Sequence, residues 1–316
     1  MAKCMLKKLF FSLLFSIIIY SIIIYLFGLG GITANLKNLS SFSIIIVIFL
    51  VFLSLFFEFL RWNFYMHKLG ISLSLFKNLA IFSSGLALGF LPSKSGELVR
   101  YYFLKKENVS LSTSVPVHFV SNITNFVVVL LCATPILFIF GKEKIFFIAV
   151  GILLLLYTSF RKPILYLKLL RFIRNKTKLN FIQNIEKTLI SSKKLLDVKG
   201  LLISFTLTVF HYMAIWLILF FILRDLSDTS FFLTVSIYSL SLIAGAISMI
   251  PGGIGVIEGG NIAMLSFFMD PVIATTFILV VRFFTFWIPC FIGFIFLTII
   301  SNKKFRRPIL KYEKKN

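Results

Sequence analysis

Two breaks built from proline and glycine interrupt apolar stretches of this chain, and each ends in a glutamate. The first reads LPSKSGE over residues 91–97, and the second reads IPGGIGVIE over residues 250–258. Backbone that leaves a helix at membrane depth is tolerated only where protein or a water-filled cavity satisfies its polar groups. When such breaks lie at corresponding positions in two halves of a chain, they indicate a central binding site in a membrane transporter.

The second break offers backbone groups that suit an anion. Pro251 is followed by Gly252, Gly253 and Gly255, and the stretch ends at Glu258. Glycines let a ligand approach the backbone closely, and exposed amides at a helix start favour anions such as phosphate. The alternative is that the glycines only let two helices pack tightly. The glutamate that follows directly favours the functional interpretation.

Charged residues also surround the first break and lie inside the apolar segments. Lys94, Glu97 and Arg100 follow the first proline at a spacing of three, which brings charge to the mouth of that break. Glu58 and Arg61 are at i and i+3, on one face of a helix, where they can pair with each other. The alternative for these two residues is a position at the membrane interface, from which both side chains reach water.

Arg282 lies near the middle of its apolar segment. A charge at that depth is expected to find an anion, which here is Glu258, Glu58 or a bound ligand. His211 also lies within an apolar segment, and we interpret it as a packing residue whose polar groups are satisfied; the alternative is a role as a proton relay. A polar stripe at helical spacing faces a cavity or forms hydrogen bonds between helices; it consists of Ser114, His118, Ser121, Asn122 and Asn125.

The composition excludes several classes of protein. The chain is 59% hydrophobic and carries a net charge of +22, although only 14% of its residues are charged. Its mean hydropathy is +1.00. These values are typical of a multi-pass membrane protein with basic loops, and they argue against a nucleic-acid partner. No Ser-His-Asp or Cys-His set, metal-ligand spacing or phosphate loop is found, so we expect no enzyme activity, cofactor or metal.

The apolar segments that must position these residues are long enough to cross a membrane. Crossing a hydrocarbon core of ~30 Å takes about 20 helical residues. We expect an all-α polytopic integral membrane protein, a single domain over residues 1–316, with about six full spans plus two re-entrant or broken helices at 75–91 and 231–250. The expected full spans are 9–27, 42–60, 115–140, 145–160, 200–223 and 271–300.

Basic residues in loops mark the cytoplasmic side of a membrane protein. They cluster at the N-terminus, in the loop 161–199 and in the tail 303–315, so we expect both termini to be cytoplasmic in the plasma or inner membrane. The crossing count then makes each broken segment return to its own side, and the halves 42–140 and 200–300 form an inverted repeat. The alternative is that both broken segments simply cross.

The basic loop contains apolar residues at helical spacing. Ile182, Ile185, Leu189 and Leu196 alternate with lysines, as in an amphipathic helix that lies on an anionic leaflet. The alternative is an ordinary solvated connector.

Three motifs resemble one family. They are Glu58-x-x-Arg61-Trp62, LPSKSGELVR over 91–100 and PGGIGVIE over 251–258. Together they resemble the lysylphosphatidylglycerol synthase transmembrane region, a flippase-like domain, over about residues 9–300. In two-domain members the membrane part moves an aminoacylated phospholipid between leaflets, and a separate soluble domain makes that lipid. The resemblance therefore implies lipid translocation without aminoacyl transfer by this chain.

The same resemblance implies roles for individual residues. Its motif positions are occupied by Glu97, Arg100, Pro251, Gly252, Gly253, Gly255 and Glu258. Lys94 departs from the arginine expected there; lysine keeps the charge but loses the bidentate grip on phosphate.

From these observations we expect a flippase-like protein that takes the head group of an anionic phospholipid or a polyprenyl-phosphate lipid into a polar cavity. Arg282, Arg100 and Lys94 would hold the phosphate, assisted by the glycine amides. Glu58, Glu97 and Glu258 would pair with these cations or contact a cationic head group, and Glu258 is the carboxylate expected to carry protons if transport is proton-coupled. The alternative is a non-transporting membrane subunit of a glycosyltransferase or another enzyme of envelope biosynthesis. A transferase embedded in the membrane is disfavoured because no catalytic motif is found.

Overall fold

The computed structural model describes residues 2–89, 96–161, 188 and 190–302. Within these ranges the side chains of 2–13, 96–98 and 154–161 are not described. Every regular element in the described part of the chain is helical, and no strand occurs there. The expected all-α class is therefore confirmed.

In the described part of the chain, four helical stretches are long and apolar enough to span a membrane. They are α3 (Ser41–Lys68), α6 (Leu111–Ile139), α10 (Val198–Leu226) and the continuous run Pro271–Ser301. That run consists of α13 (Pro271–Arg282), a π-helical turn η3 (Phe283–Trp287) and α14 (Ile288–Ser301).

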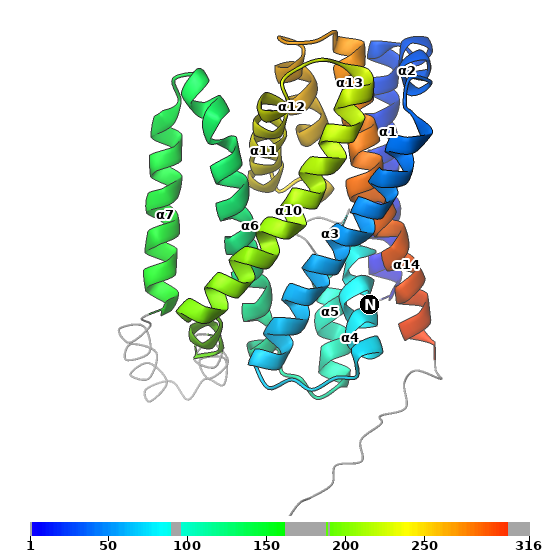
Figure 1. Cartoon of the computed structure of the whole chain (residues 1–316). Helices are drawn as coiled ribbons and strands as arrows, with labels where there is room; N and C mark the ends of the chain where they lie inside the picture. The colour runs from blue at the N-terminus through cyan, green and yellow to red at the C-terminus, as the bar shows by residue number, and fades with distance from the viewer. Residues whose placement is uncertain (1, 90–95, 162–187, 189, 303–316) are drawn as a thin grey trace, which may run out of the picture.

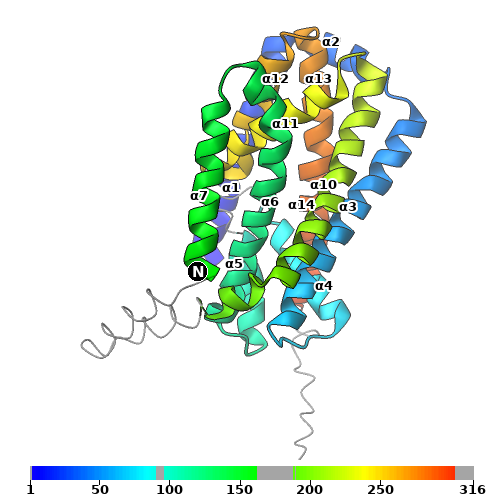
Figure 2. The ribbon, with the colours of Figure 1, turned by 60° about the vertical axis from the view of Figure 1, so that its left-hand side comes forward.

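Helices α1 (Ala2–Phe27) and α2 (Leu29–Leu36) meet at an angle of 91°. They add a fifth span if the two are counted as one bent element. Helix α7 (Glu143–Arg161) packs mainly against α6 at the edge of the bundle, as Figures 1 and 2 show. The chain is therefore a multi-pass helical membrane protein, as its composition predicts.

Side-chain caps fix where several of the long helices begin. Ser40 accepts a hydrogen bond from the backbone N–H of Ser43 at the start of α3. Asp270 accepts one from Val272 at the start of α13, over 2.8 Å. Each cap satisfies an amide that has no partner within its own helix.

Two pairs of short helices accompany the long ones. The first pair is α4 (Leu75–Leu86) and α5 (Gly96–Lys106), and the second is α11 (Phe231–Ile247) and α12 (Val256–Leu265). At 1.5 Å per residue, α4 is about 18 Å long, which is too short for a hydrocarbon core of ~30 Å. In Figure 1 the first pair occupies the lower end of the bundle, where α3 ends and α6 begins. The second pair occupies the upper end, where α10 ends and α13 begins.

The long helices hold the short pairs in place. Helix α3 packs along α10, α4 packs on α14, and α11 packs on α6. The α4–α14 contact is so close that a Cβ atom on Gly293 would lie 2.2 Å from the backbone nitrogen of Ala87. Only glycine allows the two backbones to approach this closely.

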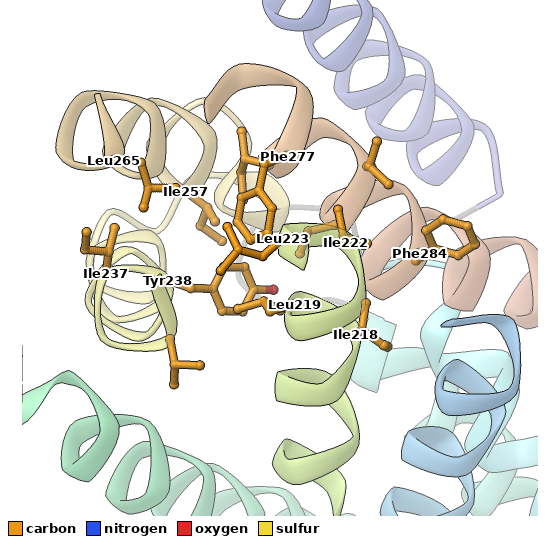
Figure 3. Close-up of a cluster of buried hydrophobic side chains, with 14 of the residues drawn as sticks. Ile218, Leu219, Ile222, Leu223, Ile237, Tyr238, Ile257, Leu265, Phe277 and Phe284 are labelled. Atoms are coloured by element: carbon orange, nitrogen blue, oxygen red, sulfur yellow. The ribbon is translucent and has the colours of Figure 1, made fainter. Parts of the chain in front are cut away.

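Two clusters of buried apolar side chains stabilise the two ends of the bundle. Figure 3 shows the upper cluster, in which Leu219 of α10, Ile237 of α11, Ile257 of α12 and Phe277 of α13 converge. The lower cluster joins α3, α4, α5 and α6 and includes Tyr65, Phe82, Leu104 and Val117. The polar residues of interest lie on the same helices as these clusters.

Only one residue of the expected amphipathic loop helix has a described side chain. Leu196 is fully buried in the lower cluster, so the prediction that it lies on a lipid leaflet is wrong. It packs against protein because α10 starts only two residues later, at Val198. Ile182, Ile185 and Leu189 lie outside the described residues.

Candidate functional site

The second break is a tight turn that only glycine can form. Pro251 begins a single 3-10 turn that ends at Gly253, and α12 starts at Val256. Gly252, Gly253 and Gly255 have φ of 60°, 63° and 87°, in the left-handed region that side chains disfavour. Because the turn folds back on itself, the carbonyl of Gly252 and the amide of Gly255 are both directed at the side chains described next.

Glu258 is the centre of a buried network. Its Oε2 atom accepts the backbone N–H of Gly255 over 2.7 Å. Its Oε1 atom accepts Arg282 Nε over 2.7 Å and the hydroxyl of Tyr20 over 2.8 Å. Arg282 also donates to the carbonyl of Gly252 over 2.7 Å. We call these five residues the Glu258 network.

The Glu258 network answers two questions that the sequence raised. The anion that Arg282 finds is Glu258, which is completely buried, while Arg282 is 4% exposed. The amide at the start of α12 is also occupied, because Glu258 caps its own helix. The expected phosphate site at this helix start is thus filled from within the protein.

A charged cavity lies between α3, α5, α6, α10 and the π-turn of the last span. Its volume is about 310 Å³. Its apolar wall includes Phe82, Ile215 and Phe284. The polar residues that line it are Glu58, Arg61, Arg100, His118, Ser121, Asn122, Asn125 and His211. Most of the predicted polar stripe of α6 faces this cavity, whereas Ser114 bonds back to its own helix.

The side chain of Arg61 bonds to two other helices, α6 and α10, instead of pairing with a residue of α3. Its guanidinium donates to Asn125 over 2.6 Å and to Thr208 over 2.5 Å, with a longer contact to Thr124 at 3.4 Å. Since no ion pair with Glu58 forms, the predicted pairing of these two residues is wrong. Helix α3 continues to Lys68, so Arg61 lies inside the bundle, with 2% exposure, rather than at an interface.

Glu58 is half-buried and lines the cavity. Among the residues that the structure describes, its carboxylate has no hydrogen bond and no ion pair. The groups whose charge acts on it are His211, Arg100, Arg61 and His118. An acidic side chain held open toward a cavity at this depth is uncommon, because polar groups inside a membrane are normally bonded.

Arg100 reaches the cavity from the first pair of short helices. Its Nε atom donates to the carbonyl of Phe82 over 2.9 Å, and its guanidinium lies over the rings of Phe82 and Trp62, at 4.6 and 5.2 Å. The side chain passes directly over Gly85, where a Cβ atom would lie 2.2 Å from Nε. Gly85 therefore makes room for this arginine.

A second, larger cavity adjoins the first. Its volume is about 570 Å³, and it shares Gly89, Asn122 and Asn125 with the charged cavity. Its wall is mainly apolar and comes from α6, α11 and the second break, with Arg282 at one side. The two cavities therefore lie next to each other along α6, which lines both of them.

The predicted site residues fall into three groups. Glu58, Arg61 and Arg100 line the charged cavity. The predicted residues of the second break surround Glu258 and Arg282 or form the turn itself: Pro251, Gly252, Gly253 and Gly255. Lys94 and the side chain of Glu97 lie outside the described part of the structure.

Sequence reasoning missed three contributors. Tyr20 gives no signal, because it is one tyrosine in an apolar run whose distant partner is set only by the fold. Thr208 and His211 are at i and i+3 on α10, and that spacing could have identified them as one polar face. His211 does bond to protein, through Nδ1 to the carbonyl of Ser54 at 3.0 Å, but it also lines the charged cavity.

Comparison with known families gives one match. The family model described as the lysylphosphatidylglycerol synthase TM region matches residues 9–293. This range includes every described residue that lines the two cavities. A search of curated proteins gives no match.

Proposed function

The chain belongs to the family of the lysylphosphatidylglycerol synthase TM region, and on that basis we propose that it moves a lipid head group across the membrane. The head group carries phosphate, as in an anionic phospholipid or a polyprenyl-phosphate lipid. It occupies the charged cavity while the acyl or prenyl chains stay in the bilayer. The protein acts without a catalytic step of its own.

One observation carries this proposal: Arg61 is a buried cation that lines a cavity and has only neutral hydrogen-bond partners among the described residues. A charge at the centre of a bilayer helix costs about 2.5–3.5 kcal/mol on insertion scales. Among the described residues of the lining, Arg100 adds a second cation, and Glu58 supplies the one carboxylate. The lining therefore favours an anion, and arginine suits phosphate because its planar fork donates two parallel hydrogen bonds.

The proposed phosphate ligands differ from those expected from the sequence. Arg282 already has its anion in Glu258, and its charge is compensated. Arg61 takes its place and meets the head group together with Arg100, which the sequence already indicated. The Glu258 network then serves as a scaffold that fixes the second break next to the larger cavity.

We further propose six spans arranged as an inverted repeat with two re-entrant hairpins. Each half contributes a span, a short helix pair and another span. The packing supports this symmetry, because α4 of the first half rests on α14 of the second, and α11 of the second rests on α6 of the first. The two spans α3 and α10, which would be equivalent, pack on each other. Inverted repeats of this kind enclose a substrate site near the bilayer midplane.

The orientation follows from the loop charges. The lower end in Figure 1 is where α3 ends in Lys68, α5 ends in Lys105 and Lys106, and α10 begins beside Lys199. The upper end carries Asp228 and Asp270, in the loops that flank the second hairpin. Following the positive-inside rule, we propose that the lower end faces the cytoplasm of the plasma or inner membrane. The start of α1 and the end of α14 are both at that end.

Reconstitution in liposomes tests the proposal. The purified protein is placed in vesicles of phosphatidylcholine with a trace of fluorescent phosphatidylglycerol, and an impermeant quencher reports which leaflet holds the label. We expect the protein to make the inner-leaflet label accessible, and Arg61→Gln and Arg100→Gln to slow this strongly. If every lipid tried stays in its leaflet and an envelope enzyme co-purifies with the protein, the non-transporting subunit is the correct interpretation.

A further inference from the structure

Glu258, which is fully buried, and Glu58, which is half-buried, differ in their surroundings. Glu258 has three partners and no open side. Glu58 lines the charged cavity without a hydrogen bond or ion pair to the described residues. A carboxylate that exchanges protons with water must be reachable from it, and of these two carboxylates Glu58 meets this condition. The expectation that Glu258 is the proton-carrying residue therefore loses its structural basis.

Glu58 shares the cavity with basic side chains from four helices, α3, α5, α6 and α10. No ionisable residue of α4 lines the cavity, and the last span contributes only Cys290. The titratable and charged groups that line the cavity around Glu58 are Arg61 of α3, Arg100 of α5, His118 of α6, His211 of α10 and Cys290 of α14. In the empty cavity the two arginines stabilise the ionised carboxylate, since opposite charges nearby favour the charged form.

A phosphate in the cavity changes this balance. It approaches the same two arginines and brings negative charge close to Glu58, which disfavours the ionised carboxylate. Uptake of one proton removes that repulsion and leaves the net charge of the occupied cavity one unit more positive than with an ionised Glu58. On release of the head group, the arginines again favour the carboxylate, and the proton leaves to water.

His211 is suited to assist this exchange. Its Nδ1 atom lies 3.0 Å from the carbonyl of Ser54, an oxygen that can only accept. Nδ1 therefore carries the hydrogen in the neutral ring, and Nε2 is left as the nitrogen that can accept a proton. Because His211 and Glu58 line one cavity from adjacent helices, both can exchange protons with the water it holds.

We propose that Glu58 binds the coupling proton, so that one phosphate-bearing head group crosses the membrane together with one proton in the same direction. This inference rests on the proposed lipid transport. The balance is simple: a proton from water on the acidic side forms the Glu58 carboxyl group and is released to water on the alkaline side. No other bond forms or breaks.

A pH gradient across the liposome tests the coupling. With fluorescent phosphatidylglycerol in phosphatidylcholine vesicles, and with protein-free vesicles as the baseline, we expect the label to accumulate in the leaflet on the alkaline side. Glu58→Gln should abolish this accumulation, and Glu58→Asp should keep part of it. The matched control is Asp228→Asn, which removes an exposed carboxylate in the loop between α10 and α11 and should change nothing. If the wild-type protein moves the lipid at a rate and to an extent that do not depend on the pH gradient, the proposed coupling is wrong, although the proposed transport still holds.

A second measurement does not depend on transport or on the folding of Glu58→Gln. Glycerol 3-phosphate is added to the detergent-solubilised wild-type protein in weak buffer with a pH indicator. We expect uptake of about one proton per bound molecule, accompanied by a carboxylic acid band in the infrared difference spectrum. The absence of proton uptake overturns the inference, as does equal uptake by a folded Glu58→Gln protein. If lipid transport fails in every vesicle, this second measurement still decides the role of Glu58.

Discussion

Arg282 Nε lies 2.7 Å from Glu258 Oε1, and this ion pair joins the last span to the helix that follows the second break. Both side chains are almost completely buried. Tyr20 of α1 and the backbone amide of Gly255 also donate hydrogen bonds to Glu258, and Arg282 donates one to the carbonyl of Gly252. Its geometry is that of a structural ion pair, since both carboxylate oxygens of Glu258 are bonded within the protein and its side chain has no exposed surface.

Removing one partner of this ion pair should unfold the upper half of the bundle. Arg282→Ala leaves an uncompensated carboxylate in a buried site, which costs about 3–5 kcal/mol. We expect a large fall in the thermal stability of the protein in detergent, measured as the fraction that stays monodisperse on size exclusion after heating. Tyr20→Phe removes two hydrogen bonds, the one donated to Glu258 and the one accepted from Trp287 Nε1, and should cost about 1–3 kcal/mol. A fully stable Arg282→Ala protein would contradict the structural role.

The contact between α4 and α14 depends on the absence of a side chain at one position. Gly293→Ala introduces a Cβ atom 2.2 Å from the backbone of Ala87, and backbone cannot rotate away. Overpacking of this kind costs about 1–3 kcal/mol. The matched control is Gly151→Ala in α7, where nothing lies within 4 Å and where stability should stay the same or rise by up to about 1 kcal/mol. Equal melting temperatures for the two variants would show that α4 does not rest on α14.

The labelling rate of a native cysteine with charged reagents should report the net charge of the cavity. Cys290 lines the charged cavity, and Cys4 and Cys132 can be replaced by serine. Because two arginines face one glutamate, we expect a negatively charged methanethiosulfonate to label Cys290 faster than a positively charged one. Arg100→Gln should reduce that preference. Faster reaction of the cationic reagent would contradict a cavity that attracts anions.

Much of the fold follows from the sequence, and the reason is the membrane. The long apolar runs predict α3, α6, α10 and the last span to within a few residues at most ends, because a hydrocarbon core sets their length. The end of α3 is the main error: the expected span stops at residue 60, but the helix continues to Lys68. Trp62 and Tyr65 lie beyond the expected end, and they bond to Asn78 of α4 and Ser204 of α10 in the lower cluster.

The candidate site is only partly predictable for a different reason. The sequence identifies Glu58, Arg61, Arg100, Glu258 and Arg282 as the charged residues inside or beside apolar segments, since each such charge needs a partner. It cannot say which partner each one takes. Arg61 bonds to residues 63, 64 and 147 positions away, and Arg282 to residues 24 and 30 positions away. Those distances along the chain are bridged only by the packing of whole helices.

The two short helix pairs should be reached from opposite sides of the membrane. Single cysteines at Gly70 and Asn108 flank the first pair, and cysteines at Asp228 and Phe267 flank the second. We expect an impermeant thiol reagent, applied to inside-out and right-side-out vesicles, to label the first two from the cytoplasmic side and the other two from the opposite side. If the cysteines at positions 70 and 108 are labelled from opposite sides, the first helix pair crosses the membrane.

Removal of either cavity arginine should weaken head-group binding. Losing a hydrogen bond to a charged group costs about 1.5–3 kcal/mol, so Arg61→Gln and Arg100→Gln should each slow lipid movement about 10- to 100-fold. Lys199→Gln removes the same charge from the exposed start of α10 and is the matched control, with an expected rate close to wild type. Arg100→Lys should recover only part of the rate, because lysine lacks the planar fork of arginine.

The most direct test of the central claim is the leaflet exchange of fluorescent phosphatidylglycerol in vesicles that contain the wild-type protein, folded Arg100→Gln or Lys199→Gln. The account predicts rapid exchange for the wild type and Lys199→Gln, and slow exchange for Arg100→Gln. Equal exchange in all three proteins would contradict a head-group path through the charged cavity.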